Sequence, residues 1–353
     1  MISRRRFITV VSGSAVAGGF LAACSDGSTS EPGGTSAAIA PTTAAPPGPP
    51  PASIVLDDGP SSASPFITPV GDFFLIDTAF DAPEVDADTW SLTVKGLVDN
   101  ELTLSLADLT GFEFIERTIT ISCVSNEVGG GLVGNAVWGG VRLKDVLDRA
   151  GVMEGAEQVF STSVDGWTCG FPVGVALDGR DAMIAVTMNG EPLTAKHGFP
   201  ARLIVPGLYG YVSATKWLET IEINRWDDAA GYWIPLGWSR DAPVKTASRI
   251  DVPRLYETLP EGRQTLAGVA WAPHTGIAGV EVRIDEGEWS AAVLGAEDID
   301  DAWRTWTFDW DAVPGHHSVE VRAIDKSGYV QTDEKADVMP DGATGHHRVP
   351  FDI

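Results

Sequence analysis

Cys123 is the residue of this sequence whose surroundings most clearly suggest chemistry. It ends the apolar stretch RTITISC and precedes the glycine run at 129–131, in a chain that has only three cysteines. A deprotonated cysteine is a nucleophile and a soft metal ligand. The residues therefore raise three hypotheses for Cys123: a metal ligand, the nucleophile of a Cys–His hydrolase, or half of a disulfide with Cys169.

The stretch that carries Cys123 has the alternating pattern of a strand. Ile119, Ile121 and Cys123 share one face, while threonine and serine side chains share the other. We expect a strand that delivers the sulfur inward from its apolar side. The glycine run that follows is expected to form a flexible turn.

Motifs for several other sites are missing from the sequence. It contains no Cys-x-x-Cys, His-x-x-x-His or Cys-x-x-Cys-His, which argues against structural zinc and covalent haem. The glycine run is not followed by Lys-Ser or Lys-Thr, so it is not a nucleotide phosphate loop. The histidine pairs at 316–317 and 346–347 are predicted to be surface residues, because neighbours on a strand point to opposite faces.

Residues 54–240 are predicted to form a mixed α+β domain. WSLTVKGLV, EQVFSTSV and ARLIVPG are typical of strands. LSLADLTGF is expected to be a short helix that ends at Gly111, and VRLKDVLDRAG a helix that ends at Gly151. Residues 241–353 are predicted to be an all-β immunoglobulin-like sandwich, because AGVAWAP, GVEVRID, RTWTFDW and HSVEVRAID alternate between glycine and proline turns.

The first residues have the pattern of an export signal. SRRRFIT leads into an apolar stretch that ends in LAAC, which predicts a twin-arginine (Tat) signal over 1–23 and lipidation of Cys24. An uncleaved membrane anchor is the alternative, although the stretch is marginal in length for a spanning helix. Residues 24–53 are rich in proline, alanine and serine and are expected to be a disordered tether. We expect an exported, extracytoplasmic protein held at the cell membrane by its lipid.

The charge of the chain excludes one class of partner. The formal net charge is −25 and the pI is near 4.4. Nucleic-acid binding needs a basic surface, so no nucleic-acid partner is expected. An acidic surface that keeps an exported protein soluble is the simpler interpretation.

Two long stretches resemble the molybdopterin domain of the sulfite oxidase family. They are SCVSNEVGGGLVGNAVWGGVRLKDVLDRAGV and MNGEPLTAKHGFPARLIVPGLYGYVSATKWLETIEI, and the predicted sandwich resembles that family's C-terminal dimerisation domain. The resemblance covers about residues 70 to 353. It implies an Mo-molybdopterin oxidoreductase in which Cys123 is the protein ligand to molybdenum. It also implies that the glycine run lets a large cofactor approach, and that a homodimer could form through the C-terminal domain.

The same resemblance implies the other site residues. Arginine and lysine are suited to the pterin's terminal phosphate. Two residues would act with Cys123 in catalysis, namely Asp165 and Trp167. The implied cofactor-binding residues are Phe73, Asn126, Gly134 and Asn135 of a GNA turn, His197, Arg202, Ser213 and Lys216.

Some positions depart from the pattern of the family's sulfite enzymes. Asn126 is followed by Glu127 and Val128 where those enzymes have two arginines, and FFLIDTAF has Leu75 and Ile76 where an arginine is frequent. Trp167 stands at the position of an active-site tyrosine. Sulfite is a small dianion that needs converging cations, so efficient sulfite oxidation is not expected.

The expected activity is two-electron oxygen-atom transfer between water and a small substrate. An S-oxide reductase of the methionine sulfoxide type is the alternative enzyme, and a cofactor-free lipoprotein binding module is the alternative of another class. Because the sequence has no covalent haem motif, electrons are expected to pass to a separate partner, either a cytochrome or a quinone-linked membrane protein.

Overall fold

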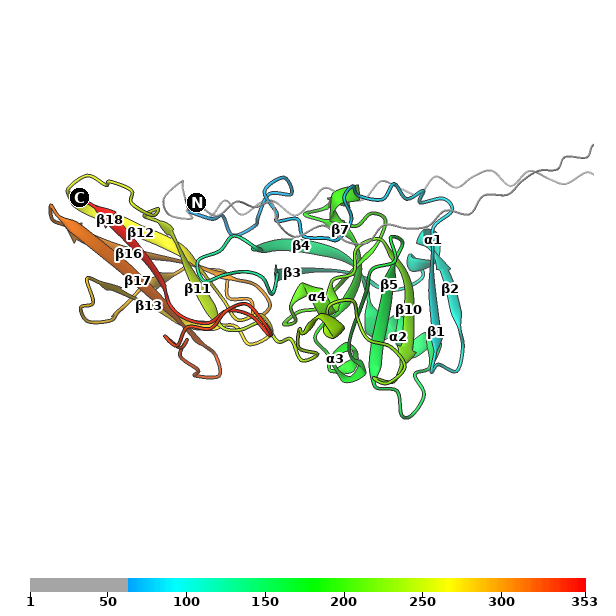
Figure 1. The fold of residues 1–353 in the computed structure, drawn as a ribbon. Coiled ribbons are helices and arrows are strands. Elements are labelled where there is room, and N and C mark those ends of the chain that lie inside the picture. The colour runs from blue at the N-terminus through cyan, green and yellow to red at the C-terminus, as the bar shows by residue number, and fades with distance from the viewer. Residues whose placement is uncertain (1–62) are drawn as a thin grey trace, which may run out of the picture. The chain divides into compact units, whose positions relative to one another are not determined.

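Two sheets and short helices make up the N-terminal part of the chain (Figure 1). The structure is a computed structural model that describes residues 63–353. The first sheet has the order β2 (Leu102–Ser105), β1 (Ser91–Gly96), β10 (Leu218–Asn224), β5 (Gln158–Ser163) and β6 (Thr168–Pro172). The second has the order β3 (Phe114–Ser122), β4 (Val133–Arg142), β7 (Met183–Met188) and β8 (Glu191–Pro192), and β9 (Arg202–Ile204) also pairs with β7.

The helices of this part are short. They are α1 (Leu106–Leu109), α2 (Leu143–Ala150), α3 (Val173–Leu177) and α4 (Gly210–Ser213), with 3-10 turns η1 (Ala195–His197) and η2 (Ile234–Leu236). The helix predicted to end at Gly151 is confirmed as α2. Gly151 has φ 73° and its N–H donates to the Leu147 carbonyl, a left-handed cap that favours glycine.

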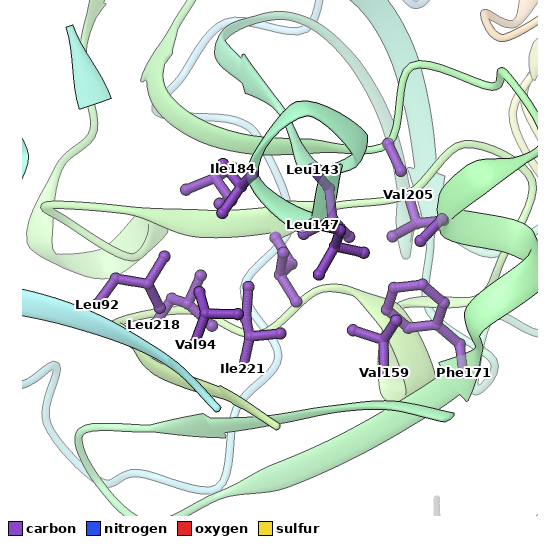
Figure 2. Packing of buried hydrophobic residues seen from close by; sticks show 14 of the residues in the cluster. Leu92, Val94, Leu143, Leu147, Val159, Phe171, Ile184, Val205, Leu218 and Ile221 are labelled. Carbon is purple, nitrogen blue, oxygen red and sulfur yellow. The ribbon is translucent and has the colours of Figure 1, made fainter. Parts of the chain in front are cut away.

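The main core lies between the first sheet and α2 (Figure 2). Leu92 and Val94 of β1 and Ile221 of β10 are fully buried, as is Leu147 of α2. Burial of each such side chain contributes roughly 1.5–3 kcal/mol. This core fixes the ends of β5 and β10, which lead to the site described below.

One local prediction was confirmed and one was wrong. The short helix expected within LSLADLTGF is α1, which ends at Leu109 rather than at Gly111. Leu104 and Ser105 are the end of β2, and Ser105 starts the helix through a capping box with Asp108. The GNA stretch was expected to be a turn, but Gly134 lies within β4 and pairs with Ile121 of β3. This strand was missed because its glycines and other small residues do not give an alternating apolar and polar pattern.

Two four-stranded sheets make up the C-terminal part, as the predicted sandwich requires. On β16 (Arg304–Ala312), the side chains of Trp306, Phe308 and Trp310 all join the core between the sheets. One sheet has the order β11 (Ala247–Val252), β12 (Gly262–Trp271), β16, β15 (Val293–Leu294). The other has the order β14 (Ser290–Ala291), β13 (Ile277–Ile284), β17 (His316–Asp325), β18 (His347–Asp352).

The hydroxyl face of β3 is covered by the C-terminal part of the chain. The Thr120 N–H donates to the Asp301 carbonyl at 2.8 Å, and the Trp303 N–H donates to Thr120 Oγ1 at 2.6 Å. Phe66 and Val133 join Trp303 in a shared apolar cluster. Both faces of β3 are therefore buried over its last four residues, 119–122, which lead to Cys123.

Some predictions concern residues that the structure does not describe. The signal over 1–23, the lipidated Cys24 and the tether over 24–53 all lie outside residues 63–353. The domain boundary at 240/241 stays a prediction. Within residues 63–353, no helix has the length and apolarity needed to cross a membrane.

Candidate functional site

The Cys123 thiol lies on the wall of a cavity in the N-terminal part. The cavity contains about 970 Å³ of empty space, counting the part that opens to solvent. Its wall is mostly aromatic and aliphatic. The charged side chains of the wall come from only a few segments of the chain. The aromatic lining consists of Phe73, Phe74, Trp167, Tyr211, Trp217, Trp233 and Trp238.

Cys123 is held by the main chain at the end of β3. Its N–H donates to the Leu132 carbonyl at 2.9 Å, and its Sγ accepts from the Ser125 N–H at 3.4 Å. Burial raises the pKa of the Cys123 thiol, and the Ser125 hydrogen bond offsets this only in part. A thiolate at this place therefore needs a cation such as a metal to stabilise it.

Cys169 does not pair with Cys123. Both cysteines are free. Cys169 Sγ is buried 3.1 Å from Thr215 Oγ1, and burial raises its pKa to about 11. Among the described residues, Cys169 is not part of the cavity wall. The disulfide hypothesis is therefore not supported.

Arg202 places a buried cation at the cavity. The side chain is 5% exposed and lies 5.1 Å from the Trp138 ring. Nη1 and Nη2 donate to main-chain carbonyls of His197 and Ala214, but Nε has no partner within residues 63–353. Burial lowers the pKa of Arg202 to about 9. A buried guanidinium with a free N–H fits an anionic ligand, because Arg binds phosphate through paired N–H donors.

Lys216 and His197 complete the polar end of the cavity. Lys216 Nζ bonds to the Asp77 carboxylate and, at 3.1 Å, to the Lys196 carbonyl. Burial lowers the pKa of Lys216, and the hydrogen bond that Lys216 donates to Asp77 opposes this shift. His197 Nε2 donates to the Val70 carbonyl at 3.1 Å, and burial lowers the pKa of His197, which favours the neutral ring.

Phe73 and the β5–β6 turn supply further predicted residues. The Phe73 ring stacks on Phe74 with centroids 5.2 Å apart, and Gly134 lies so close that a Cβ there would be 2.7 Å from the Phe73 ring. Asp165 and Trp167 both line the cavity, and Asp165 Oδ1 accepts from the Trp167 N–H at 3.1 Å. The structure thus brings Phe73, Asp165 and Trp167 to the same cavity as Cys123.

Four predicted binding residues lie outside the wall of this cavity among the described residues. Asn126 Oδ1 accepts from the Leu132 N–H at 2.8 Å. Asn135 is buried between Thr120 Oγ1 and the Phe66 carbonyl. Ser213 Oγ donates to the Tyr209 carbonyl at 3.0 Å, and Gly134 supports Phe73 as described. The side chains of Asn126, Asn135 and Ser213 are thus hydrogen-bonded to other groups of the protein, most of which are main-chain groups.

Among the described residues, the glycine run lies outside the wall of the cavity that holds Cys123, and its expected role in cofactor access stays a prediction. A Cβ on Gly129 would be 2.3 Å from the His347 ring, and Arg249 Nη1 donates to the Gly130 carbonyl at 3.0 Å. Glu127 and Val128 are exposed and line a second cavity against the C-terminal part. The carboxylate of Glu127 is therefore not on the wall that holds the Cys123 thiol. Close packing against His347 accounts for Gly129, whereas a Cβ on Gly130 would meet Asn126 and Glu127 of the same loop, and a Cβ on Gly131 would meet nothing within 4 Å.

Sequence reasoning missed several residues of the cavity. Asp77 lies only a few positions after Phe73 and Phe74. The residues around Asp77 do not predict its ion pair with Lys216. Trp233 and Trp238 come from an irregular segment without periodicity. Ser163 ends a predicted strand, and its hydroxyl has no partner among the described residues. Only three-dimensional contacts bring these residues together.

Comparison with known proteins identifies the family of the chain. Residues 79–233 match the oxidoreductase molybdopterin binding domain. Chicken sulfite oxidase (Gallus gallus) is 30% identical over 324 residues, which cover 78% of this chain and 70% of that protein. Human mitochondrial sulfite oxidase (Homo sapiens) is 30% identical over 323 residues, which cover 77% of this chain. The match spans only 58% of the human protein's length.

A solved structure also has a similar fold. The sulfane dehydrogenase SoxCD of Paracoccus pantotrophus aligns with a TM-score of 0.67 and 26% identity, over 76% of this chain and 75% of that one. The fold and the cavity define a molybdopterin-binding oxidoreductase. The chain belongs to the sulfite oxidase family, which implies Mo-molybdopterin as its cofactor.

Proposed function

We propose that this chain is a molybdenum oxidoreductase that transfers an oxygen atom to or from a small neutral substrate. The observation that carries the proposal is that one cavity wall holds both a partly buried cysteine thiol and two buried cations, of which Arg202 has an N–H that no described group uses. When bound, Mo-molybdopterin supplies the two-electron chemistry. The protein supplies the ligand, the anion site and the exclusion of water.

Cys123 would hold the metal, and Arg202 with Lys216 would hold the phosphate of the pterin. The thiol must lose its proton to bind, and its raised pKa means that the positive metal has to compensate for burial. Arg202 Nε offers an N–H that no described group uses. Phe73, which packs edge-on against His197 with centroids 5.9 Å apart, would flank the pterin.

The charges on the wall favour a neutral substrate. Lys216 is already paired with Asp77, and Arg202 is deeply buried. Leu75 and Ile76 line the cavity at 45% and 51% exposure, at positions where a cation would face an entering anion. Asp165 adds a carboxylate to the same wall. Sulfite would meet repulsion without a free preorganised cation.

Reduction of an S-oxide is the second candidate function. The aromatic lining formed by Trp167, Trp233 and Trp238 favours it, because a neutral sulfoxide has apolar substituents that such a wall can cover.

We also propose an extracytoplasmic location with Tat export and a lipid on Cys24. Support comes from the arginines before the apolar stretch and from the LAAC box. Electrons would pass to a separate partner, a cytochrome or a quinone-linked membrane protein. A homodimer through residues 241–353 is part of the same proposal, as is the division of the chain at 240/241.

The substrate proposal is tested by steady-state kinetics on metal-loaded protein. Sulfite with artificial electron acceptors is compared with small sulfoxides and artificial donors. We expect kcat/KM for sulfite to be lower by about 100-fold or more than in an efficient enzyme, on the scale of one lost preorganised charge. Turnover of sulfite near about 10⁶ M⁻¹s⁻¹ would contradict the proposal.

A further inference from the structure

A second cavity adjoins the segment that carries Cys123. It contains about 980 Å³ of empty space, counting the part that opens to solvent. Residues 126–129 line it from the N-terminal part of the chain, and Tyr329 is among the sandwich residues that line it. Ser122, the residue before Cys123, lines both cavities. The two cavities therefore meet at the end of β3.

A short chain of bonds joins the Cys123 sulfur to the second cavity. The Ser125 N–H donates to Cys123 Sγ at 3.4 Å, and the next residue, Asn126, lines the second cavity. The Asn126 N–H in turn donates to the Cys123 carbonyl at 3.0 Å, so the turn is tight. Even a fully extended chain would separate the Cα atoms of residues 123 and 126 by at most roughly 11 Å. An electron leaving the sulfur can therefore reach the second cavity through one hydrogen bond and one peptide link.

The charge at the second cavity is negative. Its charged lining residues are Glu127 and Lys245, and Lys245 Nζ is already paired with the Asp341 carboxylate at 2.8 Å. Glu127 is exposed and has no ion-pair partner within residues 63–353. The lining residue Thr332 is followed by an exposed stretch, 333–337, with three carboxylates and one lysine. With a formal net charge of −25, the chain attracts a basic partner at long range.

Exposed apolar side chains lie at the same cavity. Val128 is 37% exposed and Tyr329 is 48% exposed, and both line it. Val330, the residue after Tyr329, is 41% exposed. A transient protein interface combines such an apolar centre with a charged rim, and electron-transfer encounters are small, below about 1,200 Å². The surface around the second cavity has this composition.

We propose that a small basic electron-carrier protein docks over the second cavity. A cationic side chain of the carrier would lie next to Glu127, and its apolar surface would cover Val128 and Tyr329. Docking there leaves the mouth of the first cavity, where Leu75 and Ile76 are exposed, open to the substrate. This inference rests on the proposed function, because it assumes that molybdenum is bound to the Cys123 sulfur.

The electrons of the proposed reaction balance through such a carrier. Oxidation of a substrate with the oxygen of water releases two electrons and two protons. Two oxidised carriers, arriving in turn, would take one electron each, and the protons pass to water. In the reductive direction two reduced carriers supply one electron each, and two protons join the removed oxygen to form water.

The test compares wild type with Glu127→Lys, Tyr329→Ala and the matched control Glu101→Lys in the full chain. Glu101 is exposed between β1 and β2 and, among residues 63–353, is not part of either cavity wall. The probe is mitochondrial cytochrome c, a small basic haem protein. Its binding to cofactor-free protein is measured by isothermal titration calorimetry. Electron transfer from chemically reduced, cofactor-loaded protein is followed by haem absorbance in stopped flow, without substrate.

We expect Glu127→Lys to weaken binding and slow electron transfer by about tenfold at low salt, because a charge at the rim acts on the association rate. The difference should shrink to within about twofold near 1 M salt, where charges are screened within about 3 Å. Tyr329→Ala should weaken binding by about tenfold at both salt concentrations, since tyrosine is a frequent anchor of interfaces. Glu101→Lys makes the same change of charge and should stay within about twofold of wild type.

Equal effects of Glu127→Lys and Glu101→Lys would overturn the docking surface, since only net charge would then matter. A probe that does not bind wild type, or binds it and both cavity variants alike, would overturn it as well. So would binding of ethylammonium at Glu127 as tight as that of the probe, which would make the cavity a site for small cations. Binding that depends on Glu127 with no electron reaching the haem from wild-type protein would instead overturn the proposed function and the electron-transfer role. The two failures are distinguishable, because docking is measured without cofactor.

Discussion

The two chain segments that meet at the cavity are held in different ways. The segment that carries Cys123 is completed by the protein itself: Asn126 bonds the Leu132 N–H, and Arg249 bonds the Gly130 carbonyl. The segment that carries Arg202 leaves Nε of a buried guanidinium without a partner among the described residues. The hydrogen-bonding groups of the first segment are satisfied by the protein, and we propose that a bound anion satisfies the free N–H of the second.

This difference teaches where a ligand can be located in a protein without one. The glycines after Cys123 suggested access for a cofactor, yet Gly129 packs against the His347 ring. Buried polar atoms without partners, on Arg202 and Ser163, point to the ligand more directly. Each such group is costly to bury alone, by about 1–3 kcal/mol, so a binding partner has a clear energetic role.

The largest effect is expected from Cys123→Ser. Loss of the protein's sulfur ligand should reduce molybdenum-dependent turnover by more than roughly 100-fold, since even residues that only orient a ligand cost about 10–100-fold. The fold should persist, because the Cys123 segment is held by main-chain bonds rather than by its thiol. Turnover and circular dichroism check the two parts, and unaltered turnover would refute the ligand role.

Arg202→Met should have opposite effects on the two forms of the protein. Without cofactor, we expect the free energy of unfolding to rise by about 1 kcal/mol or more, because a buried unpaired cation becomes an apolar side chain. With cofactor, pterin content should fall by about tenfold or more. Denaturant unfolding and pterin fluorescence measure these changes.

Arg348→Met is the control for Arg202→Met. Arg348 is exposed and pairs with Glu286 at 2.8 Å on the C-terminal sandwich. Arg348→Met should change neither the free energy of unfolding nor the pterin content appreciably, because surface ion pairs contribute little to stability. If Arg202→Met destabilised the cofactor-free protein, the description of the Arg202 N–H as free would be wrong.

The smallest predicted effect is a pH-dependent loss of stability where His347 contacts the segment that carries Cys123. His347 packs against Gly129, and its Nδ1 accepts from the Ile250 N–H at 3.0 Å. Burial, followed by the nearby Arg249 charge, lowers the pKa of His347 to about 4, while Asp251 opposes the shift.

The ordinary pKa of histidine is about 6.5. As the pH falls, the His347 ring therefore takes up a proton in the unfolded chain before it does so in the folded protein. Stability should fall as pH drops from about 6.5 to about 4, and no further below that range. Because the ring is partly exposed, we expect a loss of about 1 kcal/mol. The difference in unfolding free energy between wild type and His347→Gln across this range measures it; an equal pH dependence in both proteins would contradict the contact with Gly129.

Much of the fold could be predicted because it depends on alternation and on helix stops. The strand that ends at Ser122, the helix that ends at Gly151 and the shared face of Trp306, Phe308 and Trp310 all follow from local patterns. The strand β4 was missed, because its small residues and glycines do not alternate.

The site was predictable only where a motif carried it. Cys123, His197, Arg202 and Lys216 were named from the sequence and lie on one cavity, and their chemical roles remain predictions. The partnership of Lys216 with Asp77 joins residues 139 positions apart, which no local pattern encodes. Asn126 both bonds the Leu132 N–H of its own loop and lines the second cavity against the C-terminal part, and this second contact could not be predicted from local sequence.

The most direct test of the account is X-ray absorption at the molybdenum edge, on wild-type protein and on Cys123→Ser. Our account predicts that wild-type protein contains molybdenum and that the variant loses one sulfur from the metal's coordination shell while keeping the sulfurs of the pterin. An unchanged number of sulfur ligands in Cys123→Ser, or a Cys123–Cys169 disulfide in active wild-type protein, would contradict it.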